Sequence, residues 1–191
     1  GGLPPGVLNL LIGNSAVGDA MVNHADIDVI TFTGSTGVGR RIAAAAAARG
    51  IPVQAEMGGK NAAVVLDDAD FDLAVDQVML GAFRSTGQKC TATSRLVLTE
   101  GIADRFLEAL VQRADALSVG DPTVGGTEMG PVISATARAD ISAGIDTARA
   151  QGGSVLAGGG GYSDGPLAEG YFVAPTVVEL PRPADIWFRE L

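Results

Sequence analysis

Short apolar runs alternate with stretches of helical spacing along most of the chain. The runs predict strands at residues 7–12, 27–33, 51–57, 62–66, 95–99, 154–156, 171–173 and 176–180. The stretches between them predict helices at residues 15–24, 40–48, 71–83, 102–117 and 135–150. Strands that alternate with helices favour an α/β fold built on parallel strands.

The composition is that of a globular protein, because 47% of the 191 residues are hydrophobic and only 18% are charged. This length fits one domain or two small ones. The formal net charge of −9 argues against nucleic acid as a partner, because phosphates need a basic surface. It argues equally against an anionic membrane surface, and we see neither a signal peptide nor an apolar run of membrane-spanning length.

Cys90 is the only cysteine and His24 the only histidine. One cysteine excludes an intramolecular disulfide, so we expect a reduced thiol and a cytoplasmic protein. A metal site built on histidine and cysteine is not expected. The chain begins with glycine rather than methionine and ends without a terminal helix, from which we expect it to be a piece of a longer protein.

The first candidate site is the segment 32–39, which follows a predicted strand and leads into a helix. Unpaired backbone N–H groups and the helix dipole favour an anion there, so a pyrophosphate can bind near Gly34 and Ser35. The glycine spacing differs from the usual dinucleotide fingerprint. A plain strand-to-helix turn with Ser35 as N-cap explains the local pattern equally well.

The second candidate is Glu56, which ends a predicted apolar strand and precedes Gly58 and Gly59. Ligands bind at the carboxyl ends of parallel strands. A partly desolvated carboxylate in that position can serve as a general base. A glutamate paired with Lys60 on a loop is the alternative.

The third candidate is Cys90, which lies among small polar residues after the end of a predicted helix. Lys89 and the backbone N–H groups of a turn can favour the thiolate. Taken alone, a single cysteine is more often an inert small hydrophobe. A dyad with His24 is disfavoured because that residue is expected at a surface helix end, so a carboxylate that acts through water fits better.

These motifs, taken together, resemble the aldehyde dehydrogenase superfamily. The matching stretches are residues 32–36 (Phe-Thr-Gly-Ser-Thr), 56–61 (Glu-Met-Gly-Gly-Lys-Asn) and 87–92 (Gly-Gln-Lys-Cys-Thr-Ala). Residues 130–133 and 170–176 are also similar to that family, so the resemblance covers nearly the whole chain.

The resemblance implies a partial Rossmann-type NAD(P)-binding domain at residues 1–57 and a partial α/β catalytic domain at residues 58–191. Cys90 is then the nucleophile that attacks an aldehyde, and Glu56 activates the water that hydrolyses the thioester. NAD or NADP is the implied cofactor. The residues implied to bind it are Thr33, Gly34, Ser35, Gly39 and Met57. The parent protein is expected to be a homodimer or homotetramer.

The resemblance also implies parts that this chain does not contain. The asparagine that completes the oxyanion hole and the segment that contacts the adenosine ribose are expected before Gly1. Glu190 is a candidate for the glutamate that binds the nicotinamide ribose, although the motif around it is incomplete. We therefore expect this chain alone to be inactive. A non-catalytic protein that retains the fold is the alternative.

The amino-acid sequence around Glu56 and Cys90 is most similar to the branch of this superfamily that acts on 2,5-dioxopentanoate. Arg84 could pair with a substrate carboxylate or could be a structural arginine at a helix end, and the sequence leaves both open. An acylating enzyme that passes the thioester to coenzyme A is disfavoured, because such members usually lack the glutamate.

Overall fold

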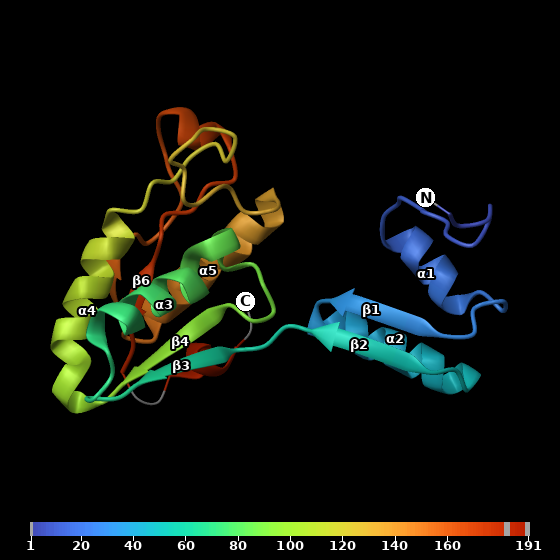
Figure 1. Ribbon diagram of the computed structural model, residues 1–191, viewed down its shortest axis with the longest axis horizontal. Coiled ribbons are helices and arrows are strands. Elements are labelled where there is room, and N and C mark those ends of the chain that lie inside the picture. The colour runs from blue at the N-terminus through green and yellow to red at the C-terminus, as the bar shows by residue number, and fades with distance from the viewer. Residues whose placement is uncertain (1, 182–183, 190–191) are drawn as a thin grey trace. The chain divides into compact units, whose positions relative to one another are not determined.

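The computed structural model describes residues 2–181 and 184–189, and the chain divides into two compact units, Gly1–Gly58 and Gly59–Leu191. The first contains α1 (Ser15–Asn23), β1 (Ile30–Gly34), α2 (Thr36–Arg49) and β2 (Val53–Met57). The second contains β3 (Asn61–Val65), α3 (Phe71–Phe83), β4 (Thr93–Leu98), α4 (Glu100–Asp115), α5 (Ala135–Ala150), β5 (Ser154–Ala157) and β6 (Val177–Glu179). Figure 1 shows these elements along the chain.

In the first unit, β1 and β2 form a parallel pair whose register runs from Ile30 opposite Val53 to Gly34 opposite Met57. Side chains alternate between the two faces of such a pair. The helix α2 packs against both strands, and Gly39 of this helix is buried next to Met57 and Phe32. The opposite face is polar and exposed, so only one face of the pair is covered by the helix.

The helix α2 begins at Thr36, four residues before the start predicted from the alanine run. The reason is the N-cap, because the Ser35 hydroxyl accepts a hydrogen bond from the Val38 N–H at 3.4 Å. Gly50 ends the helix as predicted, in the left-handed conformation with φ of 68°. The segment 36–39 is therefore the first turn of a helix rather than a loop.

Residues 7–12 do not form the strand predicted from their apolar pattern. Their side chains are exposed, with Leu10 at 82% and Ile12 at 87%. A strand needs a neighbour to pair with its N–H and C=O groups, and the described part of the chain supplies no ladder for this segment. The apolar composition alone therefore gave the wrong prediction here.

In the second unit, β3 and β4 form a parallel pair, and β5 and β6 an antiparallel one. The helix α3 packs against β4 and α4, as Figure 1 shows for the larger unit. Phe106 of α4 is fully buried, and its ring meets Phe71 edge-on with centroids 5.8 Å apart. The buried side chains around it are Val65, Val75, Val78, Met79, Ile102 and Leu110.

The helices predicted at 71–83 and 135–150 match α3 and α5 at both ends. Their N-caps explain this agreement, because Asp70 and Ser134 each accept a hydrogen bond from a first-turn N–H. The strand predicted at 171–173 is wrong, since Val173 makes only an isolated bridge to Gly161. Among the helices of residues 2–181 and 184–189, none combines the length and the apolar character that a membrane span requires.

Candidate active site

Glu56 lies at the end of β2 on the exposed face of the first unit, directly opposite Thr33 of β1. Its carboxylate is accessible to solvent, so the partial desolvation expected from the sequence is absent in this structure. Gln54 shares this face and donates from its Nε2 to Glu56 Oε1 at 3.5 Å. A solvent-accessible carboxylate at the strand end can accept a proton from water.

The helix α2 begins at Thr36, one residue after Gly34 ends β1, and Gly34 lies opposite Met57 at the end of β2. Gly34 and Ser35 are exposed, and a Cβ on Gly37 would meet nothing within 4 Å. The start of the helix is thus open to a ligand as well as capped by Ser35. The N–H groups and dipole of a helix N-terminus suit a phosphate group.

Gly39 lies on the first turns of α2 and allows Met57 to pack closely. A Cβ at Gly39 would lie 2.5 Å from Met57 Sδ and 2.8 Å from Met57 Cγ. Any larger residue at this position would require the Met57 side chain or the helix to shift. All five residues predicted to bind the cofactor therefore gather with Glu56 at one end of the β1–β2 pair.

Cys90 is exposed and lies in the second unit, on the loop between α3 and β4. After Arg84 caps α3, the backbone turns through three consecutive residues with positive φ, namely Ser85 (55°), Thr86 (57°) and Gly87 (69°). A serine and a threonine in this conformation are strained, since their Cβ atoms crowd the backbone. Strain of this kind persists only where the surroundings enforce it.

Two anchors hold the Cys90 loop in place. On the N-terminal side, Gln88 Oε1 accepts a hydrogen bond from the Ile133 N–H at 3.1 Å. On the C-terminal side, Asn61 Nδ2 donates to the carbonyl oxygens of Cys90 at 2.6 Å and Ala92 at 3.0 Å. Neither Gln88 nor Asn61 was predicted from the sequence as a site residue. Their position inside the two recognised motifs was the only signal that could have indicated them.

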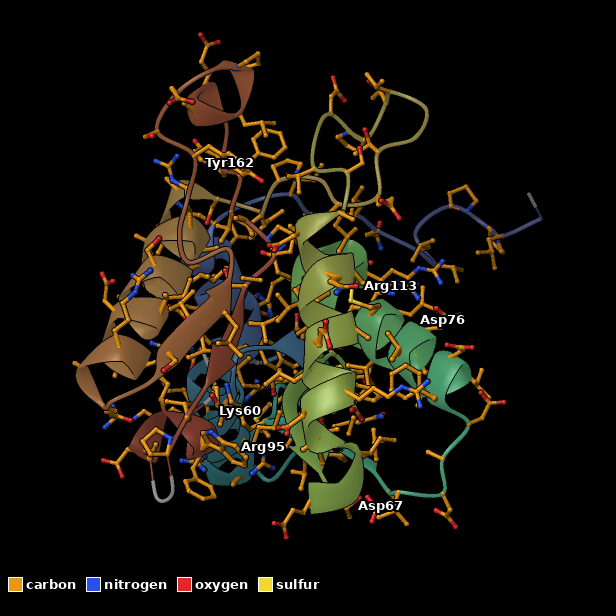
Figure 2. All side chains as sticks on the ribbon, turned by 90° about the vertical axis from the view of Figure 1, so that its left-hand side faces the viewer. Lys60, Asp67, Asp76, Arg95, Arg113 and Tyr162 are labelled. Atoms are coloured by element: carbon orange, nitrogen blue, oxygen red, sulfur yellow. The ribbon has the colours of Figure 1, made fainter. Side chains whose placement is uncertain are left out.

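Lys60 directly precedes β3 and Arg95 lies on β4, and Figure 2 shows the two residues close together. Arg95 Nη2 donates to the Lys60 carbonyl at 2.7 Å. Partial burial, and secondarily the positive charge of Arg95, lower the pKa of Lys60 below its ordinary value of 10.5. The two cationic side chains are therefore close enough for their charges to interact.

His24 and Arg84 are both exposed residues at helix ends. His24 caps α1, and its Nδ1 accepts a hydrogen bond from the Asp26 N–H at 3.2 Å, which confirms the predicted surface position. Arg84 caps α3 with its backbone N–H, and its guanidinium makes no hydrogen bond or ion pair within the described residues.

Across residues 2–181 and 184–189, no group of three or more His, Cys, Asp and Glu side chains could hold a metal ion. Glu190 lies outside the described residues.

A family model described as the aldehyde dehydrogenase family matches residues 1–191. The chain belongs to the aldehyde dehydrogenase family. The resemblance recognised from the sequence motifs is thereby confirmed, and so is the α/β fold class.

Relatives in this family are similar over nearly all of the chain. The alpha-ketoglutaric semialdehyde dehydrogenase of Bacillus subtilis (strain 168) is 44% identical over 179 residues, which is 93% of this chain and 37% of that protein. The crystal structure of PnpE in complex with nicotinamide adenine dinucleotide is 43% identical and superposes with a TM-score of 0.94. That match covers 97% of this chain and 38% of PnpE.

The betaine aldehyde dehydrogenase of Staphylococcus aureus, solved in complex with NAD+, is 38% identical with a TM-score of 0.93. Here 99% of this chain matches 38% of that structure. The chain thus spans less than two-fifths of the length of these relatives.

Proposed function

We propose that the protein is an NAD(P)-dependent aldehyde dehydrogenase that oxidises an aldehyde to a carboxylic acid. The observation that carries the proposal is Cys90, which is exposed on a strained and anchored loop in a chain of this family. Reactive cysteines need access to their reaction partner, and strained backbone gathers at active sites.

The first unit, Gly1–Gly58, is assigned to the cofactor-binding domain and the second, Gly59–Leu191, to the catalytic domain. The open N-terminus of α2 fits the pyrophosphate of a dinucleotide. Gly34 and Ser35 would hold that group with Thr33 beside it, and Gly39 would secure the contact between α2 and β2. The backbone of Met57 would serve the nicotinamide carboxamide. Relatives solved with NAD support this assignment.

Cys90 would attack the aldehyde carbon as a thiolate and form a thiohemiacetal, with the backbone N–H of Cys90 as one donor to the oxyanion. A bound NAD+ or NADP+ supplies the hydride acceptor for this oxidation. Once the former aldehyde carbon is a thioester on Cys90, Glu56 would take a proton from water as the water attacks that carbon. The C–S bond then breaks, the carboxylic acid leaves and the thiol is restored.

A substrate with a carboxylate at its far end, such as 2,5-dioxopentanoate, is the proposed aldehyde. The similarity to the alpha-ketoglutaric semialdehyde dehydrogenase of Bacillus subtilis supports it. Arg84 is exposed at the start of the Cys90 loop and its guanidinium is free to pair with a carboxylate. The cationic betaine aldehyde, named in other relatives, is the contrasting substrate in the test.

The protein is further proposed to be a cytoplasmic homodimer or homotetramer. The single unpaired thiol supports a reducing compartment. The proposed oligomeric state follows from the family resemblance, and light scattering on the full-length protein would test it.

The test is aldehyde-dependent NADH or NADPH formation by the full-length protein and its Cys90→Ser variant. We expect activity with 2,5-dioxopentanoate, loss of activity by about 10³-fold or more in the variant, and weaker use of betaine aldehyde. Iodoacetamide labelling of Cys90 should change when the cofactor is added. Unchanged activity in Cys90→Ser would disprove the assignment, whereas activity that requires coenzyme A would indicate an acylating enzyme. No activity together with cofactor-insensitive labelling would support a non-catalytic protein.

A further inference from the structure

Asn61 joins the start of β3 to the Cys90 loop through its side-chain amide. The two N–H bonds of Nδ2 serve two acceptors, the carbonyl oxygens of Cys90 at 2.6 Å and of Ala92 at 3.0 Å. A primary amide has only these two donors, so both are used on the same loop. The short bond goes to the carbonyl of Cys90 itself.

Asn61 is itself held firmly by the strand opposite. Its backbone pairs with Thr93 in the ladder of β3 and β4, and this pairing sets its position. A separate bond runs from Ser94 Oγ to the Asn61 carbonyl at 3.2 Å and does not involve the Asn61 side chain. The register shifts between Asn61 and Ala62, which is where β4 emerges from the loop. Irregularities of this kind re-aim the chain next to active sites.

Fixing the carbonyl of Cys90 fixes the peptide plane that follows it. The Ala92 N–H also donates to the Lys89 carbonyl at 3.0 Å, so the turn that contains Cys90 is closed on itself and then tied to Asn61. The bonds from Asn61 limit rotation about the Cα–C bond of Cys90. The direction in which its side chain leaves the loop depends on this restraint.

We propose that Asn61 is a positioning residue that orients Cys90 for attack on the aldehyde. The inference rests on the proposed role of Cys90 as nucleophile. It differs from a purely structural role in a specific way, because the shorter of the two hydrogen bonds from its amide ends on the carbonyl of the nucleophile. The bond from Ser94 ties the same two strands together without contacting Cys90 and therefore serves as the matched control.

The experiment compares Asn61→Ala, Asn61→Ser and Ser94→Ala in the full-length enzyme, with thermal unfolding measured alongside. A misplacement of about 1 Å can cost about 10²-fold in rate, so we expect kcat to fall by about 10–100-fold in Asn61→Ala. KM for the aldehyde should stay within about threefold, since the loss concerns attack rather than binding. Asn61→Ser keeps one donor and should recover part of kcat, while Ser94→Ala stays within about twofold of the wild type.

The proposal is overturned if Asn61→Ala keeps kcat within the range of Ser94→Ala. If Asn61→Ala does not fold, Asn61→Ser decides: a kcat equal to that of the wild type overturns the proposal, and a reduced kcat at unchanged KM supports it. The Cys90→Ser variant separates the two claims. Activity in Cys90→Ser defeats the proposed function, whereas an inactive Cys90→Ser together with a fully active Asn61→Ala defeats only the role of Asn61.

Discussion

Thr33 and Glu56 are direct neighbours across the parallel strands β1 and β2. Parallel strands end at the same edge, so the turn that starts α2 and the Glu56 carboxylate, one residue before the end of β2, lie together. The candidate phosphate-binding turn and the candidate base are thus built into one unit by a single strand pairing. A change at either strand end is expected to affect the other.

Replacing Glu56 by glutamine should separate the two halves of the reaction. Glutamine keeps the shape of the side chain but does not take a proton from water, so the thioester on Cys90 should accumulate. We expect a burst of NADH near one equivalent per active site, followed by a steady rate lowered by about 10²–10⁴-fold. Rapid-mixing measurement of NADH absorbance records both phases.

Gln54→Ala is the control for this experiment, because Gln54 shares the exposed face and contacts Glu56 at 3.5 Å. It should leave the steady rate within about threefold of the wild type, since it removes no proton acceptor. A Glu56→Gln variant that hydrolyses the thioester at the normal rate would assign the base elsewhere.

Gly39→Ala should destabilise the contact between α2 and β2. The added Cβ would lie 2.5 Å from Met57 Sδ, so the methionine or the helix must move. Overpacking of this kind costs about 1–3 kcal/mol of the free energy of unfolding. Weaker cofactor binding is also expected, and isothermal titration with NAD+ measures it.

Gly37→Ala tests whether the effect at Gly39 comes from the contact. A Cβ at Gly37 meets nothing within 4 Å, so its main effect is the higher helix propensity of alanine. We expect the free energy of unfolding to rise by up to about 1 kcal/mol. Equal destabilisation by the two variants in thermal unfolding would refute the packing argument.

Ser85→Gly should relieve strain before Cys90, because glycine adopts the observed φ of 55° without a Cβ clash. We expect the free energy of unfolding to increase by about 0.5–1 kcal/mol, after the entropy cost of glycine is subtracted. Gly87→Ala should act in the opposite direction, since its φ is 69° and its Cβ would lie 2.9 Å from the Ala82 carbonyl oxygen. Chemical denaturation of both variants measures the difference, and a stabilising Gly87→Ala would contradict it.

Lys60→Met should stabilise the protein at neutral pH. The pKa of Lys60 in the folded state lies below 10.5, so the unfolded chain binds more protons between these two values. The free energy of unfolding of the wild type therefore rises with pH across this window, as the penalty for burying the charge disappears. Methionine removes that penalty at every pH, so the advantage of the variant should shrink toward pH 10.5.

Thermal unfolding at a series of pH values checks this expectation. Lys89→Met is the control, because Lys89 is exposed and belongs to the same unit. Its effect should be small and should change little across the same pH range. A stabilisation by Lys60→Met that grows with pH would contradict the lowered pKa of Lys60 in the folded state.

The sequence by itself determined the family, the alternation of helices and strands, and the exact ends of α3 and α5. These features depend on local chemistry. A cap such as Asp70 or Ser134 acts within one turn of its helix. A family motif consists of consecutive residues, so the sequence alone reveals it. The proposed roles of Cys90 and Glu56 arose at this level and remain to be tested by the experiments above.

Only the tertiary structure decided which residues meet across long separations. The apolar segment 7–12 has strand composition but no strand neighbour in the described chain, so composition misled. The positive φ angles at Ser85 and Thr86 are imposed by the surroundings and contradict local preference. The bond from Asn61 to Cys90 joins residues 29 apart, and it depends on the pairing of β3 with β4, which no local pattern specifies.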